Sequence, residues 1–158
     1  MEIEGTEEEE LELTYIKAAE DNLRKRLDEL FAMAEDRCKH HLEFVLAQNR
    51  TRTWAEHSVL CVNPRLRENK LSVTWYVVKW YGSKAQKTRR MVKKVIVKPK
   101  NKYGYNLETL RKIAQPWEWD WVETVEKEVT PLRREAEFIA PCLGKLNKIL
   151  KGNMEGKT

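Results

Sequence analysis

Hydrophobic residues recur at intervals of three or four from about residue 11 to residue 48, and neither Gly nor Pro interrupts this stretch. This spacing places apolar side chains on one face of an α-helix and leaves polar ones on the other. The pattern predicts a helix of about 35 residues, whose near-heptad repeat requires a partner helix. Its buried face is predicted to hold Ile16, Ala19, Leu23, Leu27, Leu30, Ala34, Cys38, Leu42 and Val45.

In the middle of the chain the apolar period changes to two. From Leu71 to about Tyr81, β-branched and aromatic residues alternate with polar ones, which predicts a strand. A weaker strand is predicted within residues 54–66, stopped by Asn63-Pro64 or by a turn at Glu68-Asn69-Lys70, and a third within residues 87–98. Short links between the three strands predict an antiparallel sheet. We expect a helix to cover one face, because three strands alone are marginally stable.

The last third of the chain returns to helical spacing. Asn106 is predicted to cap a short helix over residues 107–114, and Pro116 to begin a longer one that ends near Lys151. Two prolines inside the longer pattern, Pro131 and Pro141, are expected to kink or split it. We expect the two long helices to pack antiparallel with the sheet across them, which makes the fold class α+β.

A Trp-Glu-Trp-Asp-Trp segment lies near the predicted start of the last helix. Trp117 and Trp121 are four residues apart, so on a helix they would share one face and cap the core. Trp119 would point elsewhere, toward a neighbouring element or a partner.

Charge divides the chain unevenly. Residues 1–12 contain seven Glu and no basic residue, and since the net charge is +5, the other 146 residues carry +12. We expect residues 1–10 to be an acidic leader, disordered or a frayed helical turn, residues 11–151 a single α+β domain, and residues 152–158 a flexible tail.

No part of the sequence is typical of a membrane or secreted protein. No stretch approaches about 18 apolar residues, and the N-terminus lacks the basic and apolar parts of a signal peptide. Three widely spaced cysteines do not form a paired disulfide framework. We therefore expect a soluble, cytoplasmic protein with no membrane partner.

The strongest functional signal is a run of one sign of charge. Between Glu68 and Glu108 there are eleven Lys and Arg and no acidic residue, whereas solvated surfaces normally mix signs. The run predicts contact with nucleic-acid phosphates. A Lys-rich edge that prevents sheet aggregation, or a surface for an acidic protein, remain alternatives. The candidate DNA-binding residues are Tyr76, Lys79, Lys84, Lys87, Arg89, Arg90, Lys93, Lys94, Lys98, Lys100 and Lys102.

Some of these residues suggest more than phosphate contact. Arg89 and Arg90 are the best candidates for reading base edges, because a guanidinium can grip guanine bidentately. Tyr76 shares a strand face with polar residues and is expected to be exposed, whereas Trp75 is expected in the core. Exposed rings such as Tyr76 and Trp80 could stack unpaired bases, so binding of RNA or single strands is a further alternative.

The sequence offers little for catalysis. Cys38, His40 and His41 cluster on the first helix, and His57 and Cys61 could complete a zinc site only if the fold brought them close. There is no Gly-rich phosphate loop, nucleophile elbow or paired-His motif. We expect no enzymatic activity, no metal and no cofactor.

Four short motifs occur in an order and spacing that resemble the MobI family, the auxiliary mobilisation proteins of integrative conjugative elements and conjugative plasmids. The resemblance spans about residues 70–150, and the motifs are Leu71-Ser-Val-Thr-Trp-Tyr76, Lys93-Lys-Val-Ile-Val-Lys98, Tyr103-Gly-Tyr-Asn106 and Leu132-Arg-Arg-Glu-Ala136. It implies a non-enzymatic relaxosome component that recognises the transfer origin in DNA and assists the relaxase. It adds no binding residues.

The long helices would then serve homodimerisation or docking of the relaxase. The rival class is a protein-interaction adaptor, in which the helices form a coiled coil and the basic face meets an acidic partner. The glutamate run could also mimic phosphate and cover the basic sheet when DNA is absent.

Overall fold

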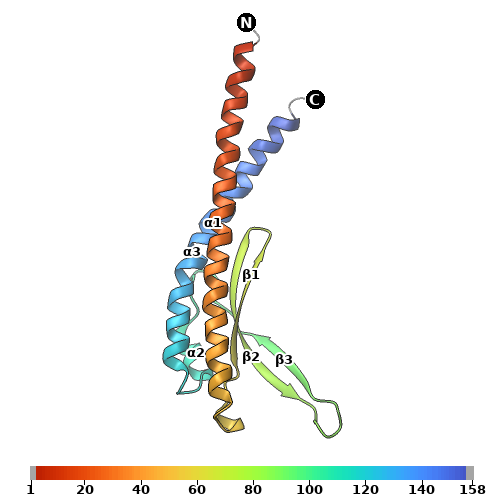
Figure 1. Ribbon diagram of the computed structural model, residues 1–158, viewed down its shortest axis with the longest axis vertical. Helices are drawn as coiled ribbons and strands as arrows, with labels where there is room; N and C mark the ends of the chain where they lie inside the picture. The colour runs from red at the N-terminus through yellow and green to blue at the C-terminus, as the bar shows by residue number, and fades with distance from the viewer. Residues whose placement is uncertain (1–2, 156–158) are drawn as a thin grey trace.

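In the computed structural model, residues 3–155 are described, with side chains for residues 7–152. The long helices α1 and α3 lie side by side and run antiparallel, and the sheet packs beside them (Figure 1). The α+β fold, with two long helices, one short helix and three antiparallel strands, is confirmed. The elements are α1 (Ile3–Asn49), the 3-10 helix η1 (Trp54–Glu56), β1 (Leu60–Arg67), β2 (Lys70–Tyr81), β3 (Arg90–Val95), α2 (Leu107–Ile113) and α3 (Trp119–Glu155).

Both long helices extend beyond the expected boundaries. Helix α1 is continuous from Ile3, so residues 3–10 of the expected leader belong to its first turns. Helix α3 continues to Glu155, through part of the expected tail. Residues 1–2 of the leader and residues 156–158 of the tail lie outside the described residues.

The outer strands pair with different halves of the central strand. Strand β1 pairs with residues 70–77 of β2, and β3 pairs with residues 76–81, so the two overlap only at Tyr76 and Val77. The sheet therefore becomes two ribbons that point in opposite directions (Figure 1). We call the ribbon formed by residues 76–95 the arm, since it projects away from the helices.

The turn between β1 and β2 falls where the sequence places it. Glu68 and Asn69 have φ angles of 51° and 66°, the left-handed conformation of a two-residue hairpin turn. The Arg24 Nη1 atom on α1 donates a hydrogen bond of 2.9 Å to Asn69 Oδ1 and holds the turn against the helix. A stop at Asn63-Pro64 is wrong, because β1 continues to Arg67. Strand β1 is an edge strand, where a missing proline N–H is tolerated.

One hydrophobic core joins the helices to the sheet. Alternate residues of β2, namely Leu71, Val73 and Trp75, face the helices and are buried. The expectation that Trp75 belongs to the core is confirmed, while Tyr76 on the opposite face is half-buried. The helices contribute buried side chains at three- and four-residue intervals: Leu27, Leu30, Ala34 and Cys38 from α1, and Val122, Val125, Val129, Leu132, Ala136, Ile139 and Leu143 from α3.

The structure corrects the expectation for the tryptophan segment. Trp117 precedes helix α3, so it does not share a helical face with Trp121, which is 39% exposed. Trp119 packs against the core instead. The buried face of α3 begins at Val122, one residue later than the interpretation that put Trp121 on it.

Helix α3 is not split by its prolines. It continues through Pro131 and Pro141, both of which are exposed. Each proline removes one backbone donor, but the buried side chains on the opposite face hold the helix against the sheet and α1. Asn106 caps α2 as predicted, with its Oδ1 atom accepting a hydrogen bond of 3.0 Å from the Glu108 N–H.

Candidate nucleic-acid interface

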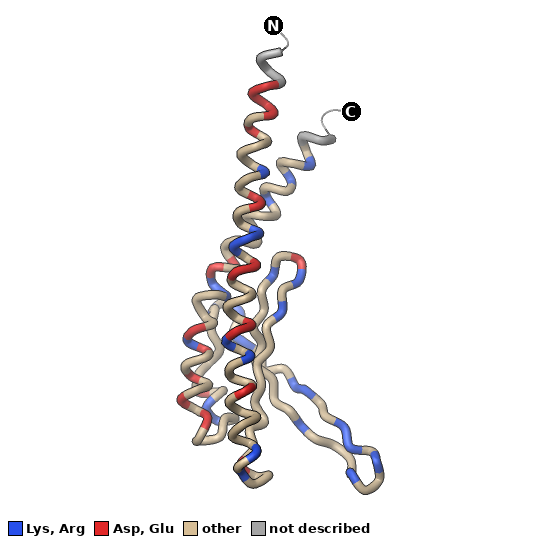
Figure 2. Tube along the Cα trace, in the orientation of Figure 1, with Lys and Arg blue, Asp and Glu red and all other residues tan. Residues whose placement is uncertain are grey.

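The arm gathers eight of the eleven predicted DNA-binding residues. Figure 2 shows Lys and Arg along the arm and around its tip, with no acidic residue among them. All six residues of β3 are exposed, because beyond the overlap only the other strand of the ribbon neighbours them. The eight residues are Tyr76, Lys79, Lys84, Lys87, Arg89, Arg90, Lys93 and Lys94.

The strand register divides the basic side chains between the two faces of the arm. Arg90 pairs with Tyr81 and Lys94 with Val77, so both share with Lys79 the face that continues from the core. Lys93 pairs with Val78 on the opposite face, with Tyr76 and Trp80. Arg90 and Lys94 therefore lie on one face and Lys93 on the other, and the arm is positively charged on both sides.

Within the described residues, the cations of the arm have no carboxylate partners, unlike several of the arginines and lysines on the helices. On the helices, Arg26 Nε lies 2.8 Å from Glu135 Oε1, and Arg37 Nε lies 3.1 Å from Glu128 Oε2. Among the side chains that the structure describes, no Lys or Arg of the arm has an ion pair within 4.0 Å. The arm therefore carries uncompensated charge, available to an anionic ligand.

Aromatic rings hold several of these cations. The Arg89 guanidinium carbon lies 4.5 Å from the ring centroid of Trp80 and 5.1 Å from that of Trp54. On the two faces of the ribbon, Arg90 lies 5.9 Å from the Tyr81 ring and Lys93 Nζ lies 5.9 Å from the Tyr76 ring. Such contacts leave N–H groups free to donate hydrogen bonds while limiting side-chain motion.

The tip of the arm is a structured loop of residues 82–89. Gly82 has a φ angle of +78°, and a Cβ atom there would lie 2.2 Å from the Thr88 carbonyl oxygen. Across the loop, the Thr88 N–H donates to the Ser83 carbonyl at 3.0 Å, and the Ser83 N–H donates to Thr88 Oγ1 at 3.0 Å. Lys87 has a φ angle of 56°. These features fix the backbone that presents Lys84, Lys87 and Arg89.

The other three predicted residues lie outside the arm. Lys98, Lys100 and Lys102 follow β3 in the segment that leads to α2. The Lys98 ammonium folds back onto that segment and donates hydrogen bonds to the carbonyls of Pro99 and Lys102. The structure therefore separates these lysines from the tip of the arm, and gives Lys98 a local backbone partner.

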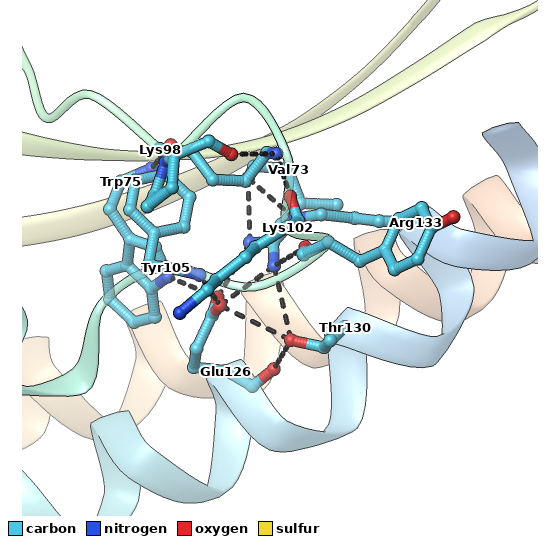
Figure 3. A network of polar contacts seen from close by, with 10 residues as sticks. Val73, Trp75, Lys98, Lys102, Tyr105, Glu126, Thr130 and Arg133 are labelled. Carbon is cyan, nitrogen blue, oxygen red and sulfur yellow. Dashed lines mark hydrogen bonds and ion pairs between the residues drawn. The ribbon is translucent and has the colours of Figure 1, made fainter.

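A buried ion pair beneath the sheet was missed by the sequence analysis (Figure 3). Arg133 and Glu126, both on α3, are 4% and 2% exposed. Arg133 Nη2 donates to Glu126 Oε1 at 2.7 Å and Nη1 to Oε2 at 2.8 Å. The same carboxylate accepts hydrogen bonds from Trp75 Nε1 at 2.9 Å and from the Tyr105 N–H at 2.8 Å. The pair is seven residues apart, two helical turns, which places polar groups on an otherwise apolar face.

This cluster takes the place of a third strand beside the first half of β2. Strand β3 reaches back only to Tyr76, which leaves backbone groups of Val73 and Trp75 without a strand partner on that side. The Val73 carbonyl accepts from Arg133 Nη2 at 2.9 Å, and the Trp75 N–H donates to the Tyr105 hydroxyl at 3.3 Å. The cluster thus supplies hydrogen-bond partners to the backbone of β2 just before the arm begins. This allows β3 to diverge from the helices.

A groove of about 580 Å³ lies between α1, the start of β1 and the arm. Its apolar residues include Leu42 and Leu46 from α1, Leu60 from β1, and Trp80 and Met91 from the arm. Most of these side chains are about half exposed, and Trp54, which also lines the groove, is more exposed still. The interleaved aromatic and basic residues of the sequence gave a partial signal for this site, but the contribution of α1 required the fold.

A second basic patch lies at the tip of the β1–β2 hairpin. Arg65, Arg67 and Lys70 surround a shallow hollow of about 390 Å³ there, together with Glu68. These residues are not among the DNA-binding residues predicted from the sequence. They lie on the ribbon that points away from the arm, so one compact surface cannot include both groups (Figure 1).

The acidic end of α1 does not cover the basic arm. Glu7, Glu8, Glu9, Glu10 and Glu12 lie on the continuous helix, at the end opposite the arm (Figure 2). A helix of 47 residues is about 70 Å long at 1.5 Å per residue. The hypothesis that this segment lies over the sheet of its own chain is therefore wrong for residues 3–12.

The residues considered for zinc do not make a metal site. Among the described residues no group of three His, Cys, Asp or Glu side chains is close enough to hold a metal ion, although His41, His57 and Cys61 all line the groove. Burial raises the pKa of the Cys38 thiol to about 12 and lowers the pKa of His41 to about 4. A buried thiol of this kind is a core residue rather than a nucleophile.

Comparison with known proteins gives one match. A family model described as MobI protein matches residues 30–147, about three quarters of the chain. No curated protein and no solved structure matches this chain. The matched part includes the arm, the groove and the buried ion pair. Separately, none of the helices in the described part of the chain is long and apolar enough to cross a membrane.

Proposed function

This chain belongs to the MobI family, and on that premise we propose that it is a non-enzymatic DNA-binding factor that recognises the transfer origin and assists the relaxase. Family membership indicates a role in conjugative mobilisation, and MobI proteins are accessory factors rather than a known enzyme family. The more specific parts of the proposal depend on the surface of this chain.

The observation that supports DNA binding most directly is the projecting, two-faced basic arm. The major groove of B-DNA is wide enough to admit a two-stranded antiparallel ribbon. A ribbon in that groove turns one face toward the base edges and runs between the two phosphate backbones, so long cationic side chains from either face can reach a phosphate. The arm provides such side chains, with Lys79, Arg90 and Lys94 on one face and Lys93 on the other.

Within this proposal the residues of the arm have different roles. Lys84, Lys87, Lys93 and Lys94 contact phosphates as flexible point charges. Arg90 at the start of β3 reaches a base edge, since a guanidinium can donate two parallel hydrogen bonds to guanine. Lys98, Lys100 and Lys102 lie beyond the ribbon and would contact only DNA that extends toward α2.

Salt dependence of binding to a transfer-origin duplex tests the electrostatic part of the proposal. If six to eight side chains contact phosphates, the logarithm of the association constant should fall with the logarithm of salt concentration at a slope of roughly −5 to −7. Fluorescence anisotropy with a labelled duplex measures this slope. Lack of binding at low salt would contradict the proposal. A scrambled duplex as competitor then separates recognition of the transfer origin from general DNA affinity.

We also propose that the diverging ends of the long helices mediate homodimerisation. The exposed acidic end of α1 and the basic end of α3, with Lys145, Lys148 and Lys151, are separate within one chain (Figure 2). Between them lies an apolar groove of about 760 Å³ that includes Leu13, Ala18 and Leu150. A second copy in antiparallel orientation would pair the opposite charges and cover this groove.

Light scattering of the purified protein tests the dimer. The expected mass is twice that of the chain, and reversal of Lys145, Lys148 and Lys151 to Glu should yield the monomer. Reversal of the same number of exposed cations elsewhere on the helices, at Lys25, Lys39 and Lys112, is the matched control and should leave the dimer intact. A wild-type monomer at all concentrations would exclude this interface.

A further inference from the structure

The groove beside the arm exposes an unusual amount of flat aromatic surface. Trp80 is 49% exposed and Trp54 is 63% exposed, and both line the groove. Large apolar side chains are normally exposed singly, and a contiguous group of them marks a binding site. The volume of about 580 Å³ lies within the range of small-ligand pockets, roughly 300–1,000 Å³.

A planar cation already occupies the mouth of this groove. The Arg89 guanidinium lies 4.5 Å from the Trp80 ring centroid and 5.1 Å from that of Trp54, and so bridges indoles from two separate parts of the chain. Arg89 ends the exposed loop of residues 82–89, whereas Trp80 lies on β2 and Trp54 on η1. The guanidinium can therefore leave more easily than the rings can move. A nucleobase is also planar and stacks on the same aromatic faces.

Charge and polar groups around the groove suit one strand of nucleic acid. None of the residues that line it is acidic, and Lys93 is among them. Arg90 and Lys94 lie on the same strand but on the other face of the arm, so Lys93 is the cation that the strand contributes to the groove. Asn63, another exposed lining residue, carries an amide that can both donate to and accept from a base edge.

We propose that this groove binds an unpaired nucleobase, which stacks on Trp80 and Trp54 while Arg89 moves from the indoles to the neighbouring phosphate. The inference rests on the proposed DNA-binding function and extends it, because it assigns single-stranded or locally melted DNA as a ligand of the same arm. The arm binds phosphates along the strand, and the groove captures one base from it. Binding is tolerant of base identity, since every base offers a stacking face.

An apolar segment of a protein is a less suitable occupant. Such a segment would cover the aliphatic walls but would leave Lys93 and the displaced Arg89 without an anionic partner. A DNA strand supplies both the flat apolar ring and the adjacent negative charge. The observations therefore favour a nucleotide over a protein side chain.

The test compares two strands of equal length and charge, an oligothymidylate and its abasic counterpart. The full-length wild-type protein is expected to bind the thymidylate strand about 5- to 150-fold more tightly, the gain from stacking one base. In the Trp54→Ala/Trp80→Ala variant this preference should disappear, while affinity for the abasic strand stays the same. Equal affinity of the wild type for both strands would overturn the inference.

A second measurement avoids the loss of packing that alanine causes. Tryptophan fluorescence should be quenched when oligothymidylate binds, and the Trp54→Phe/Trp80→Phe variant should lose most of this quenching. The matched control is Trp117→Phe/Trp121→Phe, which changes two tryptophans that do not line the groove and should keep the quenching. Quenching that persists in the first variant would place the base elsewhere and overturn the inference.

Failure of this inference can be distinguished from failure of DNA binding. If the wild type binds duplex and abasic strands but binds oligothymidylate no more tightly than the abasic strand, the groove does not bind a base. The proposal that the arm binds DNA is then unaffected. If no form of DNA binds, the proposed function fails, and the inference fails with it. If the groove variants leave every DNA affinity unchanged but prevent binding to the purified relaxase, the groove is a protein-docking surface and the inference is overturned.

Discussion

Arg133 and Glu126, two turns apart on α3, form a bidentate ion pair with N–O distances of 2.7 and 2.8 Å directly beneath the central strand. Through this pair the helix donates a hydrogen bond to the Val73 carbonyl of β2 and accepts one from the Trp75 indole. The ladder with β3 begins one residue later, at Tyr76. The ion pair therefore marks the point where the sheet leaves the helices and becomes the arm.

Replacement of Arg133 by Met should destabilise the protein by about 3–5 kcal/mol, because it leaves the buried Glu126 carboxylate without its counter-charge and Val73 without its donor. Urea denaturation measures the change in the free energy of unfolding. Arg134→Met, at the exposed neighbouring position, is the control and should change stability by no more than about 0.5 kcal/mol. A loss below about 1 kcal/mol for Arg133→Met would show that the pair contributes little to the fold.

Replacement of Gly82 by Ala should loosen the tip of the arm. The residue has a left-handed φ angle, and the new Cβ would lie 2.2 Å from the Thr88 carbonyl oxygen. Hydrogen exchange at the Thr88 amide should accelerate, with little change in the core amides, and duplex affinity should fall because the loop no longer presents Lys84 and Lys87 in a fixed geometry. Unchanged exchange at Thr88 would contradict this view of the loop.

A second glycine provides the control. At Gly144 on α3 a Cβ would have no atom within 4 Å, so Gly144→Ala meets no steric resistance. It should raise the free energy of unfolding by roughly 0.5–1 kcal/mol through helix propensity and leave DNA binding unchanged.

Stability should fall in acid partly because of His41. Its ring is 2% exposed, its nitrogens have no hydrogen-bond partner within the described structure, and burial lowers its pKa from 6.5 to about 4. Below pH 6.5 the unfolded chain binds a proton at this site that the folded chain does not. His41 therefore leaves the free energy of unfolding unchanged above that pH. As the pH falls toward 4, His41 lowers the free energy of unfolding by a total of about 3 kcal/mol.

Urea denaturation at neutral and acidic pH tests this contribution. His41→Leu should lose less stability than the wild type on going from about pH 7 to about pH 5, by roughly 2 kcal/mol. The exposed neighbour His40 supplies the control, since His40→Gln should keep the wild-type dependence. An identical acid response in His41→Leu and the wild type would assign the sensitivity to other groups.

The order and type of elements could be predicted from the sequence because their apolar periods are long and distinct. Alternation through Leu71, Val73 and Trp75 located the central strand, and helical spacing located both long helices. The predicted turn at Glu68 and Asn69 also followed from local chemistry. Features that depend on tertiary packing could not be predicted from local sequence, as the exposed Trp121 and the partly buried Trp119 show.

The charge run predicted which residues are basic, but not how they are arranged. Only the strand register shows that Arg90 and Lys94 occupy one face of the arm and Lys93 the other. Nothing in local sequence separates Lys98, which folds onto its own segment, from the cations of the arm. The bridging of Trp54 and Trp80 by Arg89 joins residues that are far apart in the chain, so it required the structure.

The most direct test of the central claim is the affinity of a charge-reversed arm for a transfer-origin duplex. Arg89, Arg90, Lys93 and Lys94 are changed together to Glu, and the matched control reverses four exposed cations of the helices, Lys25, Lys39, Lys112 and Arg134. Both variants have the same net charge, so only the position of the change differs.

If the arm is the DNA-binding surface, the arm variant should lose about 100-fold or more in affinity at moderate salt, while the control should stay within about fivefold of the wild type. Circular dichroism confirms that both variants fold. Unchanged duplex affinity of a folded arm variant would contradict the account.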